Sequence, residues 1–294
     1  MQSEKYYKSS NKANPIGLLI LLIVTIATGS ALSVLYLFLV RVIPVIQLSV
    51  LLTILFGAAL GWIGSLICSV FKIRNRALAI IVSIVGILIY SYVKWCLFTS
   101  YTISNAVDPD EASFFSLLPG YLTNPTALFE DIKLINEYGT WTFGRNSAST
   151  VNGVVLTVIW IAEFLIYAII HLVVVNSKTA TPFIEKDNKW AKKSDVRFYC
   201  RDFNVKAELS RIETDPSLLL SFLEDPQKIS TAQYVVIELY HSSDFTENYI
   251  DIIRVSITNA AQNKKSETTL VKKLAVNREI AQSLYAQHNM TLPV

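Results

Sequence analysis

Glycine is absent from this sequence after position 153, and all ten glycines lie at or before it. Without glycine, the C-terminal part cannot form a Walker A loop, a dinucleotide-binding turn or a nucleophile elbow. Cysteine is scarce as well, and three cysteines do not build a disulfide framework. His241, His288 and Cys200 lack the spacing of metal ligands. These absences predict no cofactor and no metal, and a binding module rather than an enzyme.

Charge is also low, at 17% of residues against about 25% in a typical soluble domain. It is concentrated in residues 176–294, which carry 31 of the 49 charged residues. The remainder contains four apolar runs, each longer than the roughly 20 residues that cross a bilayer: 16–40, 44–71, 77–99 and 151–175. The predicted fold class is therefore a membrane α-helical bundle of four transmembrane helices with a C-terminal soluble α+β domain.

The expected domain organisation follows the charge distribution. It comprises an N-terminal tail (1–15), a transmembrane domain (16–175) with an extracytoplasmic loop and helix segment (100–150), a basic juxtamembrane linker (176–196) and a cytoplasmic α+β domain (197–294).

Basic residues indicate the orientation. The N-terminal tail, the connection between the second and third runs and the stretch after the fourth run are basic, whereas 100–150 is acidic. Positive residues stay on the cytoplasmic side, so both termini are expected there, in a bacterial inner membrane. A net charge of +3 is too small to indicate a nucleic acid partner.

Small residues form stripes on two of the predicted spans. Gly57, Gly61 and Gly64 share one helix face, and Gly29 belongs to a similar stripe on the first span. Small residues let helix backbones approach closely in lipid. The stripe predicts either a homo-oligomer interface or packing of the first two spans within one chain.

The fourth run carries three polar side chains on one helix face, Glu163, Tyr167 and His171, at i, i+4 and i+8. A charged carboxylate near the bilayer centre costs about 2.5–3.5 kcal/mol on insertion scales, so such residues face the bundle interior. The candidate partners lie on the third run, Tyr90, Tyr92 and Lys94, with Lys94 the longest reach and able to snorkel instead. His171 is expected near the cytoplasmic interface, in contact with water. The stripe is either an interhelical contact that fixes packing or a proton or ion path.

The extracytoplasmic segment is rich in aromatic and amphipathic character. Asn124 and Pro125 predict the start of a helix and Gly139 its end. The segment 110–143 is expected to lie on the membrane surface or over the bundle, as a packed cap or as a docking surface for an extracytoplasmic partner.

In the C-terminal domain, residues 233–258 alternate as two strands joined by a turn. An exposed edge of this hairpin would suit strand addition by a cytosolic protein. A third strand is expected within 267–276, and Asn277 predicts the start of a final helix.

The functional expectation is a non-enzymatic integral membrane protein, a structural, scaffold or signal-coupling subunit of an assembly in the lipid bilayer. The alternative is a small proton- or ion-coupled transporter or channel that uses Glu163.

Overall fold

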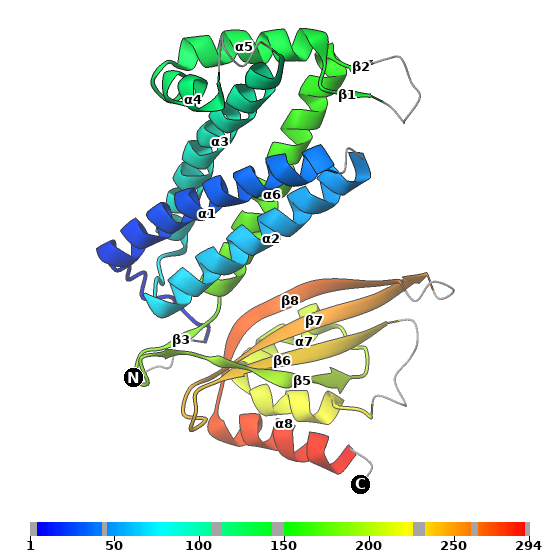
Figure 1. The fold of residues 1–294 in the computed structure, drawn as a ribbon. Coiled ribbons are helices and arrows are strands. Elements are labelled where there is room, and N and C mark those ends of the chain that lie inside the picture. The colour runs from blue at the N-terminus through cyan, green and yellow to red at the C-terminus, as the bar shows by residue number, and fades with distance from the viewer. Residues whose placement is uncertain are drawn as a thin grey trace. The chain divides into compact units, whose positions relative to one another are not determined.

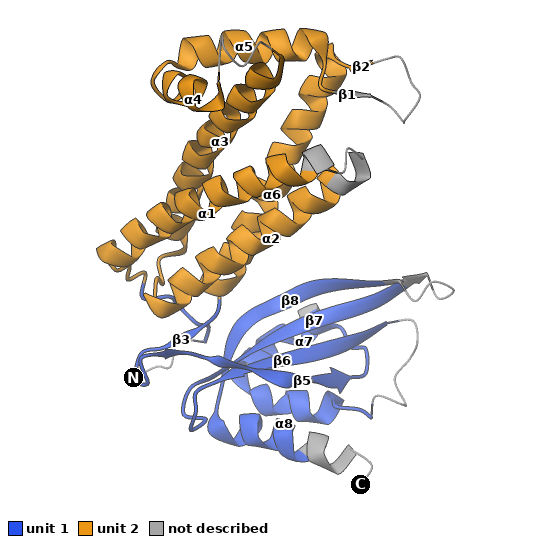
Figure 2. Cartoon of the chain, viewed as in Figure 1, with its two compact units in different colours: residues 1–10, 181–294 blue, residues 11–180 orange. Residues whose placement is uncertain are grey.

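The computed structural model of the chain describes residues 5–42, 46–106, 113–142, 150–225, 233–259 and 264–291. The chain divides into two compact units (Figure 2). Residues 11–180 form a helical unit, here called the bundle. Residues 1–10 and 181–294 form a second unit, here called the sheet domain.

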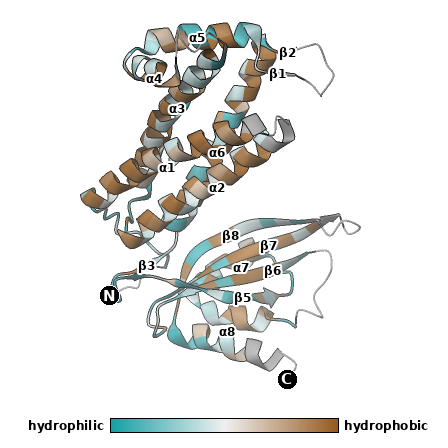
Figure 3. Cartoon of the chain, in the orientation of Figure 1, coloured by the Kyte–Doolittle hydropathy of each residue, from teal (hydrophilic) through white to brown (hydrophobic). Residues whose placement is uncertain are grey.

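Among its described residues, the bundle contains four long apolar helices (Figures 1 and 3), and each is long enough to cross a membrane. They are α1 (Pro15–Val42), α2 (Ile46–Val70), α3 (Arg76–Ala106) and α6 (Gly153–Thr179). α1 packs mainly on α3, and α2 packs mainly on α6. Four spans were predicted, and four helices of membrane-spanning length are confirmed. α3 and α6 extend beyond the predicted runs at their C-terminal ends.

Two shorter helices, α4 (Phe114–Thr123) and α5 (Pro125–Tyr138), connect α3 to α6 and pack on α3. Asn124 caps α5 by accepting a hydrogen bond from the backbone N–H of Ala127, and Gly139 ends the helix with φ 83°. The short strands β1 (Trp141–Thr142) and β2 (Thr150–Val151) pair before α6 begins. The helix predicted from its capping residues is therefore present between the expected bounds.

Large apolar side chains of α4 and α5 remain exposed. Phe115 is 83% exposed and Phe129 59%, while Tyr121 and Leu128 are buried with Cys96 of α3. This part of the segment 110–143 is thus folded onto the end of α3. A partner for its outer face stays a prediction.

The sheet domain contains a four-stranded antiparallel sheet in the order β5-β6-β7-β8. The strands are β5 (Lys192–Cys200), β6 (Gln233–His241), β7 (Asn248–Asn259) and β8 (Lys264–Val276). Helix α7 (Val205–Thr214), the 3₁₀ helix η1 (Pro216–Phe222) and helix α8 (Arg278–Thr291) cover one face of it (Figure 1). The alternation predicted for β6 holds, since Val235, Ile237 and Leu239 point into the core beneath these helices.

The predicted hairpin 233–258 corresponds to β6 and β7, which are the two central strands of the sheet. Both strands are paired on both sides, so the expected free edge for strand addition does not exist at this hairpin. The backbone groups of β6 and β7 are already used by β5 and β8.

The N-terminal segment belongs to the sheet domain. Tyr6 pairs with Leu274 of β8, the N–H of Tyr7 donates to the carbonyl of Lys273, and the carbonyl of Lys5 accepts from Ala275. Residues 5–7 therefore cover part of the β8 edge.

The basic segment 176–196 is regular structure rather than a polar linker. Its first residues complete α6, β3 (Phe183–Ile184) and β4 (Lys189–Trp190) form a short hairpin, and β5 begins at Lys192. Phe183 and Ile184 are almost fully buried, which explains why this segment is ordered despite its lysines.

Candidate functional site

A charged pair and a tyrosine meet inside the bundle, each from a different helix. α6 contributes Glu163, α3 contributes Lys94 and α1 contributes Tyr36. The Tyr36 hydroxyl donates to one carboxylate oxygen of Glu163 at 2.8 Å, and the Lys94 ammonium lies 3.7 Å from the other oxygen. Three helices that are far apart in the sequence are therefore linked at one carboxylate.

The two charged side chains differ in their surroundings. The Glu163 side chain is 7% exposed, whereas that of Lys94 is 22% exposed. The Lys94 ammonium lies over the rings of Tyr36 and Tyr167, 4.9 and 5.4 Å from their centroids. Such cation–π contacts lower the cost of holding an ammonium among apolar helices.

The pair faces a cavity of about 460 Å³ between α1, α3 and α6. Its walls are largely aromatic, with Trp95 and Phe98 of α3 opposite Trp160 and Phe164 of α6. The rings of Trp95 and Trp160 meet edge to face at 4.9 Å. The segment after α5 adds Thr140, whose buried hydroxyl has no hydrogen-bond partner among the residues described. Ligand pockets have this composition, apolar and aromatic walls with a few convergent polar groups, and volumes of about 300–1,000 Å³.

The three residues of the predicted stripe are all buried in α6, but they do not form one hydrogen-bonded chain. Ser91 of α3 donates its proton to the carbonyl of Ile87, so its oxygen accepts from the Tyr167 hydroxyl at 2.7 Å. Tyr167 thus bonds to α3 rather than to Glu163 or His171.

His171 differs from its expected position. Its side chain is fully buried instead of lying near water, and neither ring nitrogen has a hydrogen-bond partner within the described part of the chain. Gly61 and Gly64 of α2 lie against it. The close approach of α2 to α6 at these glycines removes the solvent access that its position near the helix end suggested.

Of the three partners proposed for Glu163, Lys94 reaches it. Tyr90 packs its ring 5.4 Å from that of Tyr167, and the Tyr92 hydroxyl donates to the carbonyl of Tyr121 in α4. Tyr36 was not predicted. The available signal was that it is the only tyrosine in the first apolar run.

The small-residue stripes are used within the chain. A Cβ placed on Gly57 would lie 2.9 Å from the backbone of Tyr167, and one on Gly61 would lie 2.8 Å from Val174. A Cβ on Gly29 would lie 2.4 Å from the Tyr90 ring. The α2 glycines therefore serve contact mainly with α6, the fourth span, although Gly64 also lies near Leu21 of the first span. Their role as a homo-oligomer interface has lost the observation that suggested it.

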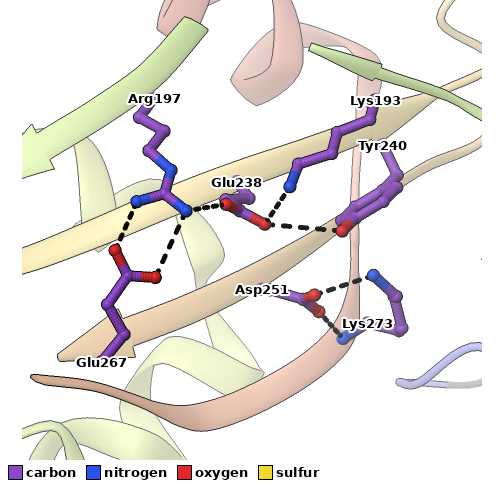
Figure 4. Close-up of polar contacts among 7 residues, drawn as sticks. All are labelled: Lys193, Arg197, Glu238, Tyr240, Asp251, Glu267 and Lys273. Carbon is purple, nitrogen blue, oxygen red and sulfur yellow. Dashed lines mark hydrogen bonds and ion pairs between the residues drawn. The ribbon is translucent and has the colours of Figure 1, made fainter. Parts of the chain in front are cut away.

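A second polar cluster (Figure 4) lies on the face of the sheet opposite α7, η1 and α8, because Glu238 and Asp251 alternate with core residues of β6 and β7. Glu238 of β6 is bracketed by the Lys193 ammonium at 2.7 Å and the Arg197 guanidinium at 2.8 Å. Arg197 also contacts Glu267. Burial alone would raise the pKa of Glu238, but the hydrogen bonds and charges of Lys193 and Arg197 outweigh it and hold that pKa below its ordinary value.

Next to this group, Asp251 of β7 accepts from the Lys273 ammonium and from its backbone N–H, each at 2.7 Å. The Lys273 ammonium also lies 3.1 Å from the centroid of the Tyr240 ring (Figure 4). Three positive and three negative side chains are thus mutually paired, which indicates a role in stabilising the sheet.

The described residues contain no group of three or more His, Cys, Asp or Glu side chains that could hold a metal ion. Comparisons with protein families, curated proteins and solved structures found no match for this chain. The candidate site is therefore the bundle cavity, defined by Tyr36, Lys94 and Glu163 at its polar end and by aromatic walls.

Proposed function

We propose that this chain is a non-enzymatic membrane protein that binds a small organic ligand in the bundle cavity and couples its binding to the sheet domain. The cavity with its buried Lys94–Glu163 pair carries this proposal. It retains the signal-coupling role expected from the sequence, whereas an oligomeric scaffold has lost support from the glycine stripes.

Covalent connectivity supports the coupling. The Tyr36–Glu163 hydrogen bond joins α1 to α6, and these are the two helices through which the chain enters and leaves the bundle. α1 follows the segment 5–7 that pairs with β8, and α6 leads directly into β3. A ligand that alters the α1–α6 contact would act on both connections to the sheet domain.

The proposed location is the bacterial inner membrane, with both termini in the cytoplasm. The basic flanks support the orientation, and the pairing of residues 5–7 with β8 supports a common side for the N-terminal segment and the C-terminal domain. An extracytoplasmic protein remains the proposed partner for the exposed apolar side chains of α4 and α5.

The test compares two substitutions on α3. Thr102 lines the cavity and, among the residues described, its side chain hydrogen-bonds only within its own helix, whereas Ser104 lies two residues away and is not among the lining residues. In phosphatidylcholine nanodiscs, naphthylmethanol is titrated and quenching of Trp95 and Trp160 is followed. Quenching should saturate in wild type and in Ser104→Phe and weaken in Thr102→Phe, because the added ring fills the cavity. Equal titrations in all three proteins would exclude the cavity as the binding site.

Coupling is measured on the same samples by hydrogen–deuterium exchange. The probe should change exchange at Tyr7 and Ala275, whose amides join the N-terminal segment to β8, in wild type and not in Thr102→Phe. Unchanged exchange with confirmed binding would reduce the protein to a ligand-binding bundle without coupling.

Proton- or ion-coupled transport is the second candidate, because an ionisable pair lines the cavity. Proteoliposomes with an internal pH dye provide the test. Flux that is present in wild type and lost in Glu163→Gln would favour transport, whereas no flux in wild type would remove it.

A further inference from the structure

We propose that the ligand of the bundle cavity is an amphipathic organic anion, whose acid group binds the Lys94 ammonium and whose apolar body lies between the aromatic walls. This inference rests on the proposed ligand-binding function and names the chemistry of the ligand.

Lys94 has unused capacity for hydrogen bonding. An ammonium carries three donors, yet among the described residues the nearest partner found for this one is the Glu163 carboxylate at 3.7 Å. The 3.7 Å separation from Glu163 is longer than the 2.7–2.9 Å of a charge-assisted hydrogen bond. Lys94 is also the more exposed member of the pair, so it is the charge that a molecule in the cavity meets.

Glu163 is better satisfied and less accessible. It accepts from the Tyr36 hydroxyl at 2.8 Å, and its side chain is 7% exposed. A cationic ligand would have to displace Lys94 both from Glu163 and from the faces of Tyr36 and Tyr167 that it already occupies. An anionic ligand needs no displacement, since it adds an acceptor to unused donors.

The walls select the rest of the ligand. Trp95, Phe98, Trp160 and Phe164 present ring faces and edges suited to a flat or branched apolar body. Thr140 also lines this cavity, and its hydroxyl, which is buried, lacks a partner among the residues described. An aromatic acid and a fatty acid share the required chemistry, an acid group on an apolar body.

The charge arrangement predicts that substitutions of Lys94 and Glu163 change the affinity for an acid in opposite directions. Lys94 would lie between two carboxylates, that of Glu163 and that of the ligand. Lys94→Met should weaken binding of an acid roughly tenfold or more, because a buried charge-assisted hydrogen bond is lost. Glu163→Gln should strengthen it, since the amide oxygen can still accept from Tyr36 while the competing negative charge is removed.

The experiment titrates three probes with one apolar body into the full chain in phosphatidylcholine nanodiscs: naphthoate, naphthylmethanol and naphthylmethylamine. Quenching of Trp95 and Trp160 reports binding. Naphthoate should bind tightest, should lose its advantage over naphthylmethanol in Lys94→Met, and should bind more tightly in Glu163→Gln. Lys133→Met is the matched control, because Lys133 lies over the Phe129 ring of α5, away from the cavity.

Further arms separate the two sources of such an acid. The affinity for laurate is compared with that for dodecanol to test a lipid-derived acid. The affinity for naphthoate is compared with that for naphthylmethanol to test a free aromatic acid. A preference for the acid in either pair, lost in Lys94→Met, supports the inference and identifies the source.

The failures are distinguishable. Equal binding of acid and alcohol, or tightest binding of the amine, overturns the anion while leaving the cavity function intact. Binding of no probe overturns both proposals. Retained naphthylmethanol binding shows that Lys94→Met is folded. Where that variant does not fold, weaker or unchanged naphthoate binding in Glu163→Gln overturns the inference.

Discussion

At the scale of single residues, Glu163 and Lys94 each reduce the cost of the other. An isolated charge in an apolar helix is expensive, and removing one partner of a buried pair leaves the other uncompensated. Tyr36 adds a hydrogen bond to the carboxylate, and the rings of Tyr36 and Tyr167 accept the ammonium. The Lys94 side chain is consequently directed toward Glu163 within the bundle.

Glu238 in the sheet domain carries a prediction for stability. Glu238→Gln removes the charge that pairs with Lys193 and Arg197. We expect a loss of about 1–2 kcal/mol at neutral pH, smaller than for a fully buried pair because both cations are partly exposed. Hydrogen exchange of the β6 amides in the full chain measures it.

The pH dependence follows from the lowered pKa of Glu238. A carboxyl whose pKa is lower in the folded state contributes stability above its unfolded pKa of about 4.3 and loses it as the pH falls through the folded value. The difference in the free energy of unfolding between wild type and Glu238→Gln should therefore disappear at acidic pH. Glu267→Gln is the control, since Glu267 is 42% exposed and its loss should cost less than about 1 kcal/mol. A gap that is independent of pH would contradict the assignment.

At the scale of elements, the helix pairs of the bundle are held close by glycines. Gly29 of α1 accommodates the Tyr90 ring of α3, and Gly61 of α2 accommodates α6. In lipid this close packing replaces the hydrophobic drive that joins helices in water.

Gly29→Ala and Gly120→Ala form a matched pair of substitutions. The new methyl at position 29 would lie 2.4 Å from the Tyr90 ring, whereas nothing lies within 4 Å at position 120 in α4. We expect Gly29→Ala to lower stability by about 1–3 kcal/mol through overpacking, and Gly120→Ala to be neutral or to raise it by up to about 1 kcal/mol through helix propensity. Thermal unfolding in nanodiscs distinguishes them. Equal midpoints for the two variants would show that α1 and α3 are not in close contact at this point.

The sequence predicted where the helices lie better than which helices pack against each other. Run length and hydropathy located the four long helices, and Asn124, Pro125 and Gly139 located α5 to the residue. The packing partner of each helix was harder to predict, because a glycine stripe indicates that another helix approaches closely but does not indicate which helix it is. The α2 stripe was expected to meet α1 or another copy of the chain, and it meets mainly α6, with Gly64 also near Leu21 of α1.

The candidate site shows the same limit. Glu163 was identified because a carboxylate in an apolar run is conspicuous, and Lys94 because it stands in the adjacent run. Tyr36 could not be assigned to Glu163, since that contact depends on how far α1 and α6 are shifted along each other. The aromatic walls were likewise hidden, because aromatic residues are common in apolar helices and only packing shows which ones surround a cavity.

At the scale of the whole molecule, the sheet domain is discontinuous in sequence, with the bundle inserted between residues 10 and 181. A strand pairing between residues 5–7 and 273–275 requires both segments to be on one side of any membrane that the bundle spans. An even number of spans satisfies this requirement, and the described part of the chain contains four candidate helices.

Cysteine labelling tests this arrangement in intact cells. Lys12→Cys and Arg278→Cys should either both be labelled by a membrane-impermeant maleimide or both be protected from it. Glu130→Cys in α5 should behave in the opposite way. All three positions are exposed, while the native cysteines Cys68, Cys96 and Cys200 are fully buried and should react slowly. Labelling of Lys12→Cys and Glu130→Cys from the same side would contradict four spans.

The N-terminal pairing also has a consequence for synthesis of the chain. Residues 5–7 leave the ribosome before any of the four long helices, whereas residues 273–275 are made after all of them. At roughly 5–20 residues per second, the interval is on the order of tens of seconds. Throughout that interval the backbone of Tyr6 cannot pair with β8, because residues 273–275 have not been translated. Closure of this sheet edge must therefore follow translation of the entire bundle, and an unpaired N-terminal segment marks a chain that is still incomplete.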